Sequence, residues 1–455
     1  MTEVSKVVEA LKATPAEGRS AAVQPGTSEA LHPLECRRRQ LVQAAFRRNV
    51  TAMVAFDMSW SLGAPLCMVG TMVPAYLLHL KAPMTLVQVV MGAIGLTMFF
   101  ELFSARACHG RRRLLKNLRI WLGVPACWLA LGILGLVLSP ASSPWLAGAA
   151  LVGLVSVACT LSYVGGPAYW ELTLDATPLA RRGLIASLRT FGGGVCGLAG
   201  SGLAAWLMIT TPAPRSFHLC FIVGGLLMLA SCGSMLFMRD YGQNGRDEAP
   251  QPRVREAFRL VLKRKGFVSL LAFHSLALAA LMIGPLIIGY GRSFAGIDDA
   301  QVWQFTMANY LGIVLLAALA PLLADRYGFR LIAVIEAVVL LLGCLALLAV
   351  GPTAMVVLPA YALISIAGAL AANVIIYLGT EMAPQVRPSV LIAVAAILAS
   401  PPNMAMTPLY GRLVDLYQLA GYRASFAIAA VLALTCLLGF AFIIPEPRKA
   451  PTLAG

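Results

Sequence analysis

The sequence has few charged residues and no stretch that would form a water-soluble catalytic domain. Charged side chains make up 12% of its 455 residues and apolar ones 59%. Soluble globular proteins are usually about 25% charged and about 45–50% apolar, so a water-soluble fold is excluded. Since a helix needs roughly 20 apolar residues to cross a bilayer, the chain has room for about twelve to fourteen crossings and little else.

The sequence also lacks the motifs of metal, nucleotide and nucleophilic chemistry. Its ten cysteines are scattered through apolar stretches without a Cys-x-x-Cys pair, and we interpret them as small apolar residues at helix contacts. No glycine-rich phosphate loop, pair of catalytic carboxylates or metal-ligand spacing is found. We therefore expect no cofactor, no metal ion and no enzymatic activity.

Twelve apolar stretches are long enough to cross a membrane as helices, which predicts an all-α multi-pass membrane protein. They lie at about 51–78, 84–104, 118–138, 145–172, 184–210, 217–238, 267–290, 302–324, 331–350, 355–379, 389–410 and 425–444. Residues 1–34 contain scattered charges and prolines but no apolar run. We expect this segment to be a flexible tail and not a cleaved signal peptide.

The basic residues are distributed unevenly over the loops between these spans. Of the 35 Lys and Arg residues, 29 fall in the two tails and in every second loop, five fall in the other loops, and Arg189 lies within a span. Cytoplasmic loops carry the excess of Lys and Arg in membrane proteins, so both termini are predicted to be cytoplasmic. The net charge of +15 is then a consequence of topology, and the expected partner is a lipid bilayer and not nucleic acid.

Three features recur in the same order in the two halves of the chain. The matched segments are 47–57 with 264–274, 109–112 with 325–330, and 175–181 with 381–387. The repeat predicts two six-helix halves joined by a basic linker. The expected division is an N-terminal tail at 1–48, a first half at 49–238, the linker at 239–265, a second half at 266–445 and a C-terminal tail at 446–455.

The loop after the eighth span has the most specific motif. Residues 321–330 read Pro-Leu-Leu-Ala-Asp-Arg-Tyr-Gly-Phe-Arg and resemble the short loop motif G-x-L-x-D-R-x-G-R-K of the major facilitator superfamily. The resemblance implies the two-half fold of these transporters and a gating role for the matching residues. In this loop they are Asp325, Arg326, Gly328 and Arg330.

The first-half copy of the motif departs from the family pattern. Gly110 and Arg111 keep its basic end, but Ala107 stands where the family acid is expected. This puts the family's latch in doubt in this half, and either Glu101 or Asp175 is a possible substitute for the acid.

Both halves also have a loop that reads acid-x-x-Pro-x-x-Arg, from Asp175 to Arg181 and from Glu381 to Arg387. These four residues join the gating candidates. In the fifth span, a glycine-rich stretch lacks the Gly-Pro step of many family antiporters. We interpret its Gly193 and Gly197 as sites of close helix packing.

Ionisable groups within spans are the strongest functional candidates, since each costs roughly 2.5–3.5 kcal/mol at a helix centre on the insertion scale. Asp57 is followed by Pro65 and Pro74, and helices interrupted in this way often line a cavity. His274 occupies the repeat-equivalent position. The family resemblance implies that Asp57 and His274 face each other across a central cavity, where they would bind substrate or a proton; the alternative for each is a structural role.

For most of the other charged residues within spans we expect a structural role. We expect Arg189 to pair with Glu171 or Asp175, the alternative being contact with an anionic substrate. Glu101 is a gate candidate, and Glu336 is interpreted as structural. The polar and aromatic candidates for the cavity are Trp60, Tyr163, Asn373 and Tyr377, although aromatic residues near span ends commonly form an interfacial belt.

These features favour a monomeric secondary transporter of a small organic solute in a plasma membrane, of the bacterial inner-membrane kind. Protons are the expected coupling ion, and symport or facilitated uptake is slightly favoured. Efflux by antiport and a scaffold or assembly factor that no longer moves solute remain the alternatives. The low charge of the spans favours a neutral or weakly charged substrate.

Overall fold

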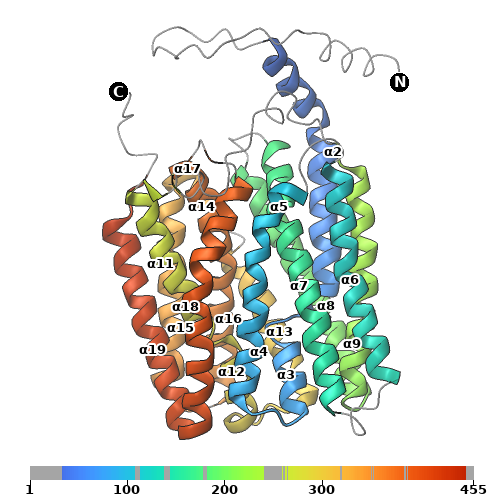
Figure 1. The fold of residues 1–455 in the computed structure, drawn as a ribbon, viewed down its shortest axis with the longest axis vertical. Coiled ribbons are helices and arrows are strands. Elements are labelled where there is room, and N and C mark those ends of the chain that lie inside the picture. Colours follow the sequence, from blue (N-terminus) through green and yellow to red (C-terminus); the bar gives the residue numbers. More distant parts are fainter. Residues whose placement is uncertain are drawn as a thin grey trace.

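The computed structural model describes residues 33–107, 113–137, 144–177, 182–239, 259, 262–263, 265–317, 320–349, 351, 353–383, 386 and 388–446. Within these residues the regular structure is helical, and the helices stand side by side in one bundle (Figure 1). The predicted all-α membrane fold is therefore confirmed. Of the site candidates, Gly110, Arg111, Arg181 and Arg387 lie outside the described residues, as does the side chain of Asp325.

The first half of the chain supplies the helices that follow one another up to residue 237. They are α2 (Pro33–Gly63), η1 (Ala64–Cys67), α3 (Met72–His79), α4 (Met84–Leu96), η2 (Thr97–Phe100), α5 (Glu101–Ala107), α6 (Arg113–Val137), α7 (Pro144–Asp175), α8 (Arg182–Thr210), α9 (Arg215–Cys232) and η4 (Gly233–Phe237). The first helix begins well before the predicted start of the first span at residue 51.

The second half supplies the remaining helices. They are α11 (Lys265–Leu281), α12 (Gly284–Phe294), η5 (Asp299–Gln301), α13 (Trp303–Gly312), η6 (Ile313–Ala317), α14 (Ala320–Tyr327), α15 (Phe329–Ala349), α16 (Ala354–Asn373), η7 (Val374–Leu378), α17 (Gly379–Met382), α18 (Pro388–Tyr417), α19 (Leu419–Leu438) and η8 (Gly439–Ile443).

Eleven helices in the described part of the chain are long and apolar enough to cross a membrane. The predicted eighth span, 302–324, contains α13, the π-helix η6 and α14. It is not among the eleven because two residues between η6 and α14 lie outside the described set. The eleven long helices and this divided one occupy the positions of the twelve predicted spans.

The first span of each half is broken where the sequence has proline and glycine. In the first half, α2 ends at Gly63, a 3-10 turn contains Pro65, and α3 starts at Met72. In the second half, α11 ends before Gly284-Pro285, and α12 starts there with proline in its first turn. Proline has no backbone N–H; it fits the first turn of a helix and kinks or breaks a helix further in. The expected interruption of the first span is confirmed.

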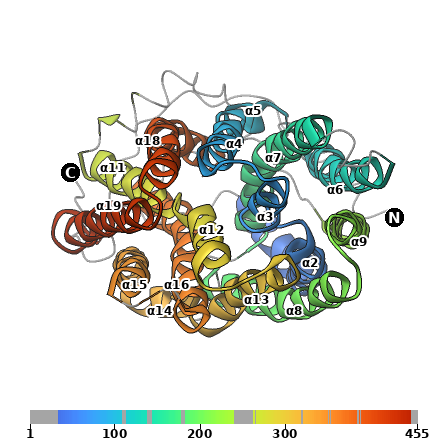
Figure 2. The ribbon, with the colours of Figure 1, turned by 90° about the horizontal axis from the view of Figure 1, so that it is seen from below.

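Helices pack against one another within each half, and several helix pairs join the halves. In the first half α2 lies against α8 and α9, and α6 against α7 and α9; in the second, α15 lies against α16 and α19, and α11 against α18. The halves meet where α4 packs on α18 and where α8 packs on α13, and both contacts are visible along the bundle axis (Figure 2).

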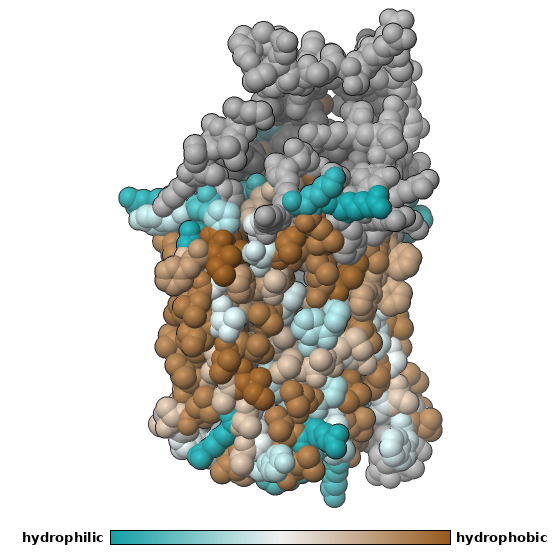
Figure 3. Space-filling model, turned by 60° about the vertical axis from the view of Figure 1, so that its left-hand side comes forward, coloured by the Kyte–Doolittle hydropathy of each residue, from teal (hydrophilic) through white to brown (hydrophobic). Residues whose placement is uncertain are grey.

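The flank of the bundle is apolar, as a surface facing hydrocarbon must be. Large apolar side chains such as Phe442, which is 81% exposed, point outward. Figure 3 shows apolar residues over the flank and hydrophilic ones near the two ends. We call the end where α6 and α15 begin the basic end, because Arg48, Arg113, Arg239 and Arg330 lie there. The end at α3 and α12 is the opposite end.

The glycines of α8 let this helix approach two neighbours closely. A Cβ atom on Gly193 would lie 2.9 Å from the Ser61 hydroxyl of α2, and one on Gly197 would lie 2.0 Å from the Tyr310 ring of α13. Backbones that approach this closely leave no room for a side chain. The prediction that these glycines serve close packing is confirmed, and Gly197 does so at the contact between the halves.

We predict that Gly197→Ala destabilises the protein and that this substitution costs less in a chain that already carries Tyr310→Ala. The new methyl group overlaps the Tyr310 ring, and overpacking of this kind usually costs about 1–3 kcal/mol. Thermal unfolding in detergent measures the effect. Gly202→Ala is the matched control, because a Cβ there meets nothing within 4 Å; equal melting temperatures for the Gly197 and Gly202 variants would contradict the prediction.

Candidate functional site

An ion pair lies inside the first half of the bundle, between α2 and α8. Arg189 donates through Nε to Oδ2 of Asp57 and through Nη2 to Oδ1 at 3.3 Å. The side chains of Arg189 and Asp57 are 6% and 21% exposed. A charge of either sign is costly at this depth, and pairing lowers that cost. Nη1 of Arg189 is buried and has no hydrogen-bond partner among the described residues.

The pairing of Arg189 differs from the one expected. Glu171 and Asp175 lie near the end of α7 and are close to Arg189 in sequence. The guanidinium of Arg189 instead binds Asp57 of α2, which is 132 residues away along the chain. Asp175 instead accepts a hydrogen bond of 2.9 Å from Arg113. The expectation that Arg189 pairs with Glu171 or Asp175 is therefore wrong. The face that a helix turns inward decides its partners, and Arg189 faces α2.

Aromatic rings surround the guanidinium on its other sides. Its Cζ lies 5.2 Å from the ring centroid of Tyr169 and 4.7 Å from that of Trp170, within the range of cation–π attraction. The ion pair and the rings that flank it all belong to the first half.

Trp60 belongs to an aromatic cluster that supports this site. The Trp60 ring stacks on Phe56, with 5.6 Å between the ring centroids, and meets Trp121 edge-on at a centroid distance of 4.9 Å. The ring centroids of Phe56 and Tyr169 are 5.0 Å apart. These rings fill the space between α2, α6 and α7. Trp60 is thus part of the packing that fixes the helix carrying Asp57.

The second-half candidates Asn373 and Tyr377 lie at an irregular turn. Asn373 is the last α-helical residue of α16 and donates to the Ala369 carbonyl at 3.2 Å, and the π-helix η7 follows with Tyr377 in it. The ring of Tyr377 stacks on Phe329 at 4.9 Å. Single π turns are rare and frequently mark functional sites, so this turn is the second half's contribution to the candidate site.

His274 is not brought to Asp57. Its side chain is 4% exposed, and its Nδ1 has no hydrogen-bond partner in the described part of the chain. Tyr163, by contrast, interacts with Glu101, a buried carboxyl of the neighbouring span whose Oε2 is also without a described partner. Glu336 is fully buried in α15.

At the basic end, the contact between Arg113 and Asp175 joins the start of α6 to the end of α7. Arg113 follows the incomplete loop motif, and Asp175 opens the acid-x-x-Pro-x-x-Arg pattern. Asp175 thus brings an acid to the basic loop whose motif has Ala107 at the family's acidic position. Glu381, the corresponding acid of the second half, lies in the short helix α17.

The second-half motif is tied to the end of the last helix. The Arg330 side chain donates to the carbonyl oxygens of Phe440, at 3.0 Å, and Ala441, and its backbone N–H donates to Glu446 at 3.1 Å. A guanidinium at a helix C-terminus is favoured by the helix dipole. Gly328 has a φ of +94°, and a Cβ there would lie 2.3 Å from the Glu446 carboxyl, so glycine is required. Arg326 is exposed and lies over the Tyr327 ring.

Two sets of contacts join the halves at the opposite end, and sequence reasoning missed both. Asp415 of α18 accepts hydrogen bonds from the backbone N–H groups of Met84, at 3.0 Å, and Thr85, at 2.8 Å. It therefore caps the N-terminus of α4, whose preceding residue Pro83 supplies no side-chain cap. The signal in the sequence that could have indicated these contacts is the small number of charged residues in the loops of this end.

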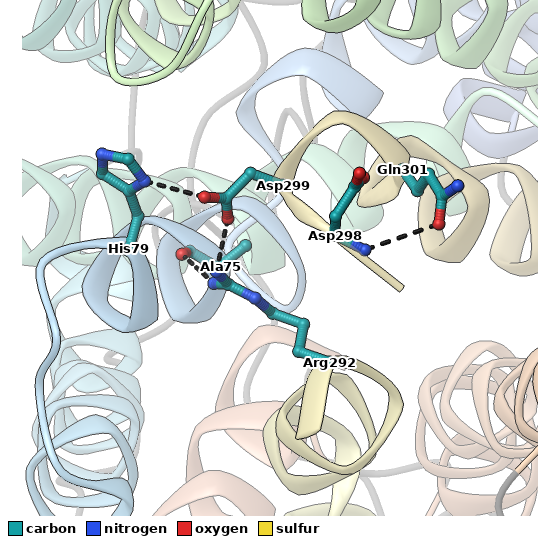
Figure 4. A network of polar contacts seen from close by, with 6 residues as sticks. All are labelled: Ala75, His79, Arg292, Asp298, Asp299 and Gln301. Carbon is teal, nitrogen blue, oxygen red and sulfur yellow. Dashed lines mark hydrogen bonds and ion pairs between the residues drawn. The ribbon is translucent and has the colours of Figure 1, made fainter. Parts of the chain in front are cut away.

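The second set contains Asp299, which the sequence suggests is solvated. Its Oδ2 lies 2.8 Å from Nδ1 of His79, and its Oδ1 lies 2.5 Å from Nη2 of Arg292 (Figure 4). Arg292 also donates to the Ala75 carbonyl at 2.9 Å. The solvated-turn interpretation is wrong for Asp299, whose carboxylate connects the halves, whereas Asp298 is exposed.

A bundle of two six-helix halves, with a buried ion pair between its helices and polar contacts at its ends, has the architecture of a membrane transporter. The profile of the Major Facilitator Superfamily matches residues 167–407, just over half of the chain. The chain therefore belongs to the Major Facilitator Superfamily. No curated protein matches it by sequence.

Solved structures of transporters share the fold at low sequence identity. The xylose transporter XylE from E. coli, in a partially occluded inward open conformation, superposes with a TM-score of 0.63 at 12% identity, over 88% of this chain and 100% of its own. A bacterial homologue of the human drug peptide transporters PepT1 and PepT2 superposes with a TM-score of 0.61 at 12% identity, over 87% of this chain and 97% of its own. The nucleoside transporter NupG superposes with a TM-score of 0.58 at 13% identity, over 89% of this chain and 100% of its own.

We predict that Arg189→Gln destabilises the protein more than the double variant Asp57→Asn/Arg189→Gln. Removing the guanidinium alone leaves Asp57 as an unpaired charge. The expected loss lies near the lower end of the about 3–5 kcal/mol known for broken buried pairs, because Asp57 is 21% exposed. Melting temperatures of the purified variants test this. A double variant no more stable than Arg189→Gln would contradict the prediction.

Proposed function

We propose that this protein is a secondary transporter that moves a small organic solute by alternating access and couples the movement to protons. The observation that supports this most is the ion pair of Asp57 with Arg189. It lies within the membrane-spanning bundle, and Asp57 remains partly exposed. Charges kept at such a depth usually mark a substrate or proton pathway.

The pair suggests how a proton and a solute would be linked. A proton bound by the Asp57 carboxylate neutralises it and weakens its hold on Arg189. The guanidinium is then a buried cation without a full partner, a costly state, and an oxygen acceptor on a solute would relieve it. Nη1, which has no described partner, is a donor available to such an acceptor.

This linkage favours symport over antiport. Proton and solute stabilise each other in the site, because the proton frees the cation that the solute's acceptor then binds. In an antiporter the two would compete. Efflux by antiport is the alternative, and the pH dependence of solute affinity distinguishes symport from antiport. Low pH strengthens solute binding in a symporter and weakens it in an antiporter.

We infer that the basic end faces the cytoplasm of a plasma membrane, since 29 of 35 Lys and Arg residues belong to that side. Glu101, Glu381 and the loop-motif residues would then regulate opening to the cytoplasm. The protein is proposed to act as a monomer. Alternating access requires each end to open in turn around a central site.

A fusion experiment tests this orientation. We predict that a green fluorescent protein attached after residue 455 is fluorescent in bacterial cells, whereas alkaline phosphatase attached at the same point is inactive, because the phosphatase needs the oxidising exterior for its disulfides. A phosphatase fused within the loop at residue 296, at the opposite end, should be active. The reverse pattern would contradict the assigned orientation.

The substrate is to be sought among small polar organic solutes. The related folds carry the names of a nucleoside, a xylose and a peptide transporter, so a panel of nucleosides, pentoses, hexoses and short peptides is the starting point. Thermal-shift measurements on purified protein at pH 5.5 and pH 7.5 identify ligands and, by the pH at which they bind more tightly, favour symport or antiport.

We predict that Asp57→Asn abolishes proton-driven accumulation of the identified solute in proteoliposomes, while exchange of solute without a pH gradient survives. Asparagine keeps the shape of the side chain and resembles the protonated acid, but it cannot bind and release a proton. The variant therefore loses proton binding and keeps the solute site. A pH-sensitive dye inside the liposomes reports the accompanying proton movement. Unchanged accumulation and unchanged proton movement would refute the role of Asp57.

Asp298→Asn is the control for this variant, since it removes an exposed acid outside the spans. Wild-type protein that moves no solute over the whole panel, yet retains a stable partner in pull-down experiments, would instead support the alternative of a non-transporting scaffold.

A further inference from the structure

The contacts at the opposite end include a histidine placed between the halves. His79 is the last residue of α3, in the first half, and its Nδ1 lies 2.8 Å from Oδ2 of Asp299, in the second half. The two side chains are 24% and 25% exposed. They are thus half-buried at the interface and still within reach of protons from the medium.

Arg292 completes the connection from the second half. It binds Oδ1 of Asp299 at 2.5 Å and donates to the Ala75 carbonyl of α3 at 2.9 Å. The carboxylate of Asp299 therefore lies between the guanidinium on one side and the imidazole on the other, and Figure 4 shows both contacts converging on it. These contacts between the halves have to break before the opposite end can open.

The charges around His79 come from several elements. Asp299 precedes α13, and Arg292 lies in the last turn of α12, where it already neutralises part of the Asp299 charge. His218 of α9 also acts on His79, but it is engaged within the first half, where its Nε2 lies 2.9 Å from the Tyr76 hydroxyl. Lys81 follows α3, and Asp298 is exposed and closes a capping box with Gln301.

The protonation state of His79 changes the strength of this connection. A neutral imidazole with its hydrogen on Nδ1 donates one hydrogen bond to the Asp299 carboxylate. A protonated imidazolium keeps that hydrogen bond and adds the attraction between opposite charges. The cation also lies at the C-terminus of α3, where positive charge is favoured. The repulsion from Arg292 is weaker because Asp299 lies between the two.

We propose that His79 is a proton-binding site of the gate at the opposite end: a proton bound there stabilises the closed state, and its release favours opening. The inference rests on the proposed alternating-access function. With the proposed orientation, protons from outside the cell bind at this gate, and it closes more firmly as the external pH falls.

The distance between the halves at the opposite end tests the proposal. Ile209 and Leu416, near the ends of α8 and α18, are 65% and 62% exposed. A non-natural amino acid at each position takes a spin label without involving the native cysteines. Double electron–electron resonance in nanodiscs at pH 5.5 and pH 8.0 then gives the ratio of closed to open populations, and no substrate is needed.

In the wild-type protein we expect the closed-to-open ratio to be at least about fivefold higher at pH 5.5 than at pH 8.0, within the usual range of coupling between two sites. In His79→Gln, which keeps hydrogen-bonding capacity but binds no proton, the ratio should be the same at both values. Asp299→Asn should behave in the same way, because the charge that attracts the imidazolium is gone.

Two control variants show whether the pH response belongs to His79. His218→Gln should keep the response, since its partner Tyr76 belongs to the same half. Asp415→Ala removes the cap on α4 and should lower the closed population at both pH values without abolishing the response. A wild-type ratio independent of pH would overturn the proposal, as would a His79→Gln variant that responds like the wild type.

Asp57→Asn distinguishes this proposal from the proposed coupling site. If the pH response of the distance persists in Asp57→Asn while proton-driven accumulation is lost, both proposals stand. If accumulation is unaffected in Asp57→Asn but His79→Gln lacks the pH response, only the coupling role of Asp57 fails. A response lost in Asp57→Asn and retained in His79→Gln overturns the gate proposal.

Discussion

A charge inside the hydrocarbon region has no water to stabilise it, and the arrangement of this protein depends on that constraint. It explains why Arg189 is paired with Asp57 and flanked by aromatic rings. It also explains why most remaining charges lie at the two ends of the bundle, where they bind backbone groups or one another. Arg330 at the end of η8 and Asp415 at the start of α4 both occupy helix termini whose dipoles favour their charge.

The two ends of the bundle use these charges differently. At the basic end, Arg113–Asp175 and Arg330–Glu446 connect helices of the same half. At the opposite end, Asp415 and the network around Asp299 connect one half to the other. The first kind of contact stiffens each half as a unit, whereas the second joins the units. A protein whose halves move against each other needs both.

Much of the fold could be predicted from the sequence because its causes are local. The length of an apolar run specifies a span, and the prolines near residues 65 and 285 interrupt the first helix of each half where they stand. Gly193 and Gly197 indicated close packing for a similar reason, since only a residue without a side chain permits it. None of these inferences required knowledge of which helix is the neighbour.

The pairing of side chains could not be predicted, because it depends on how each helix is rotated in the bundle. Arg189 was expected to pair with acids close in sequence and pairs with Asp57 instead. His274, at the repeat-equivalent position of Asp57, does not meet it. His79 and Asp299 lie 220 residues apart along the chain, and no local pattern links them. Repeat symmetry places helices more reliably than it places side-chain partners.

Helix α8 combines two of these features in one rigid element. Near its start it carries Arg189, and less than three turns further on Gly197 lies against Tyr310 of the other half. A helix of this length rotates or tilts as a whole, so any displacement of its charged end also displaces its contact with α13. The same residues that hold a charge in the membrane are thus mechanically connected to the surface where the two halves meet.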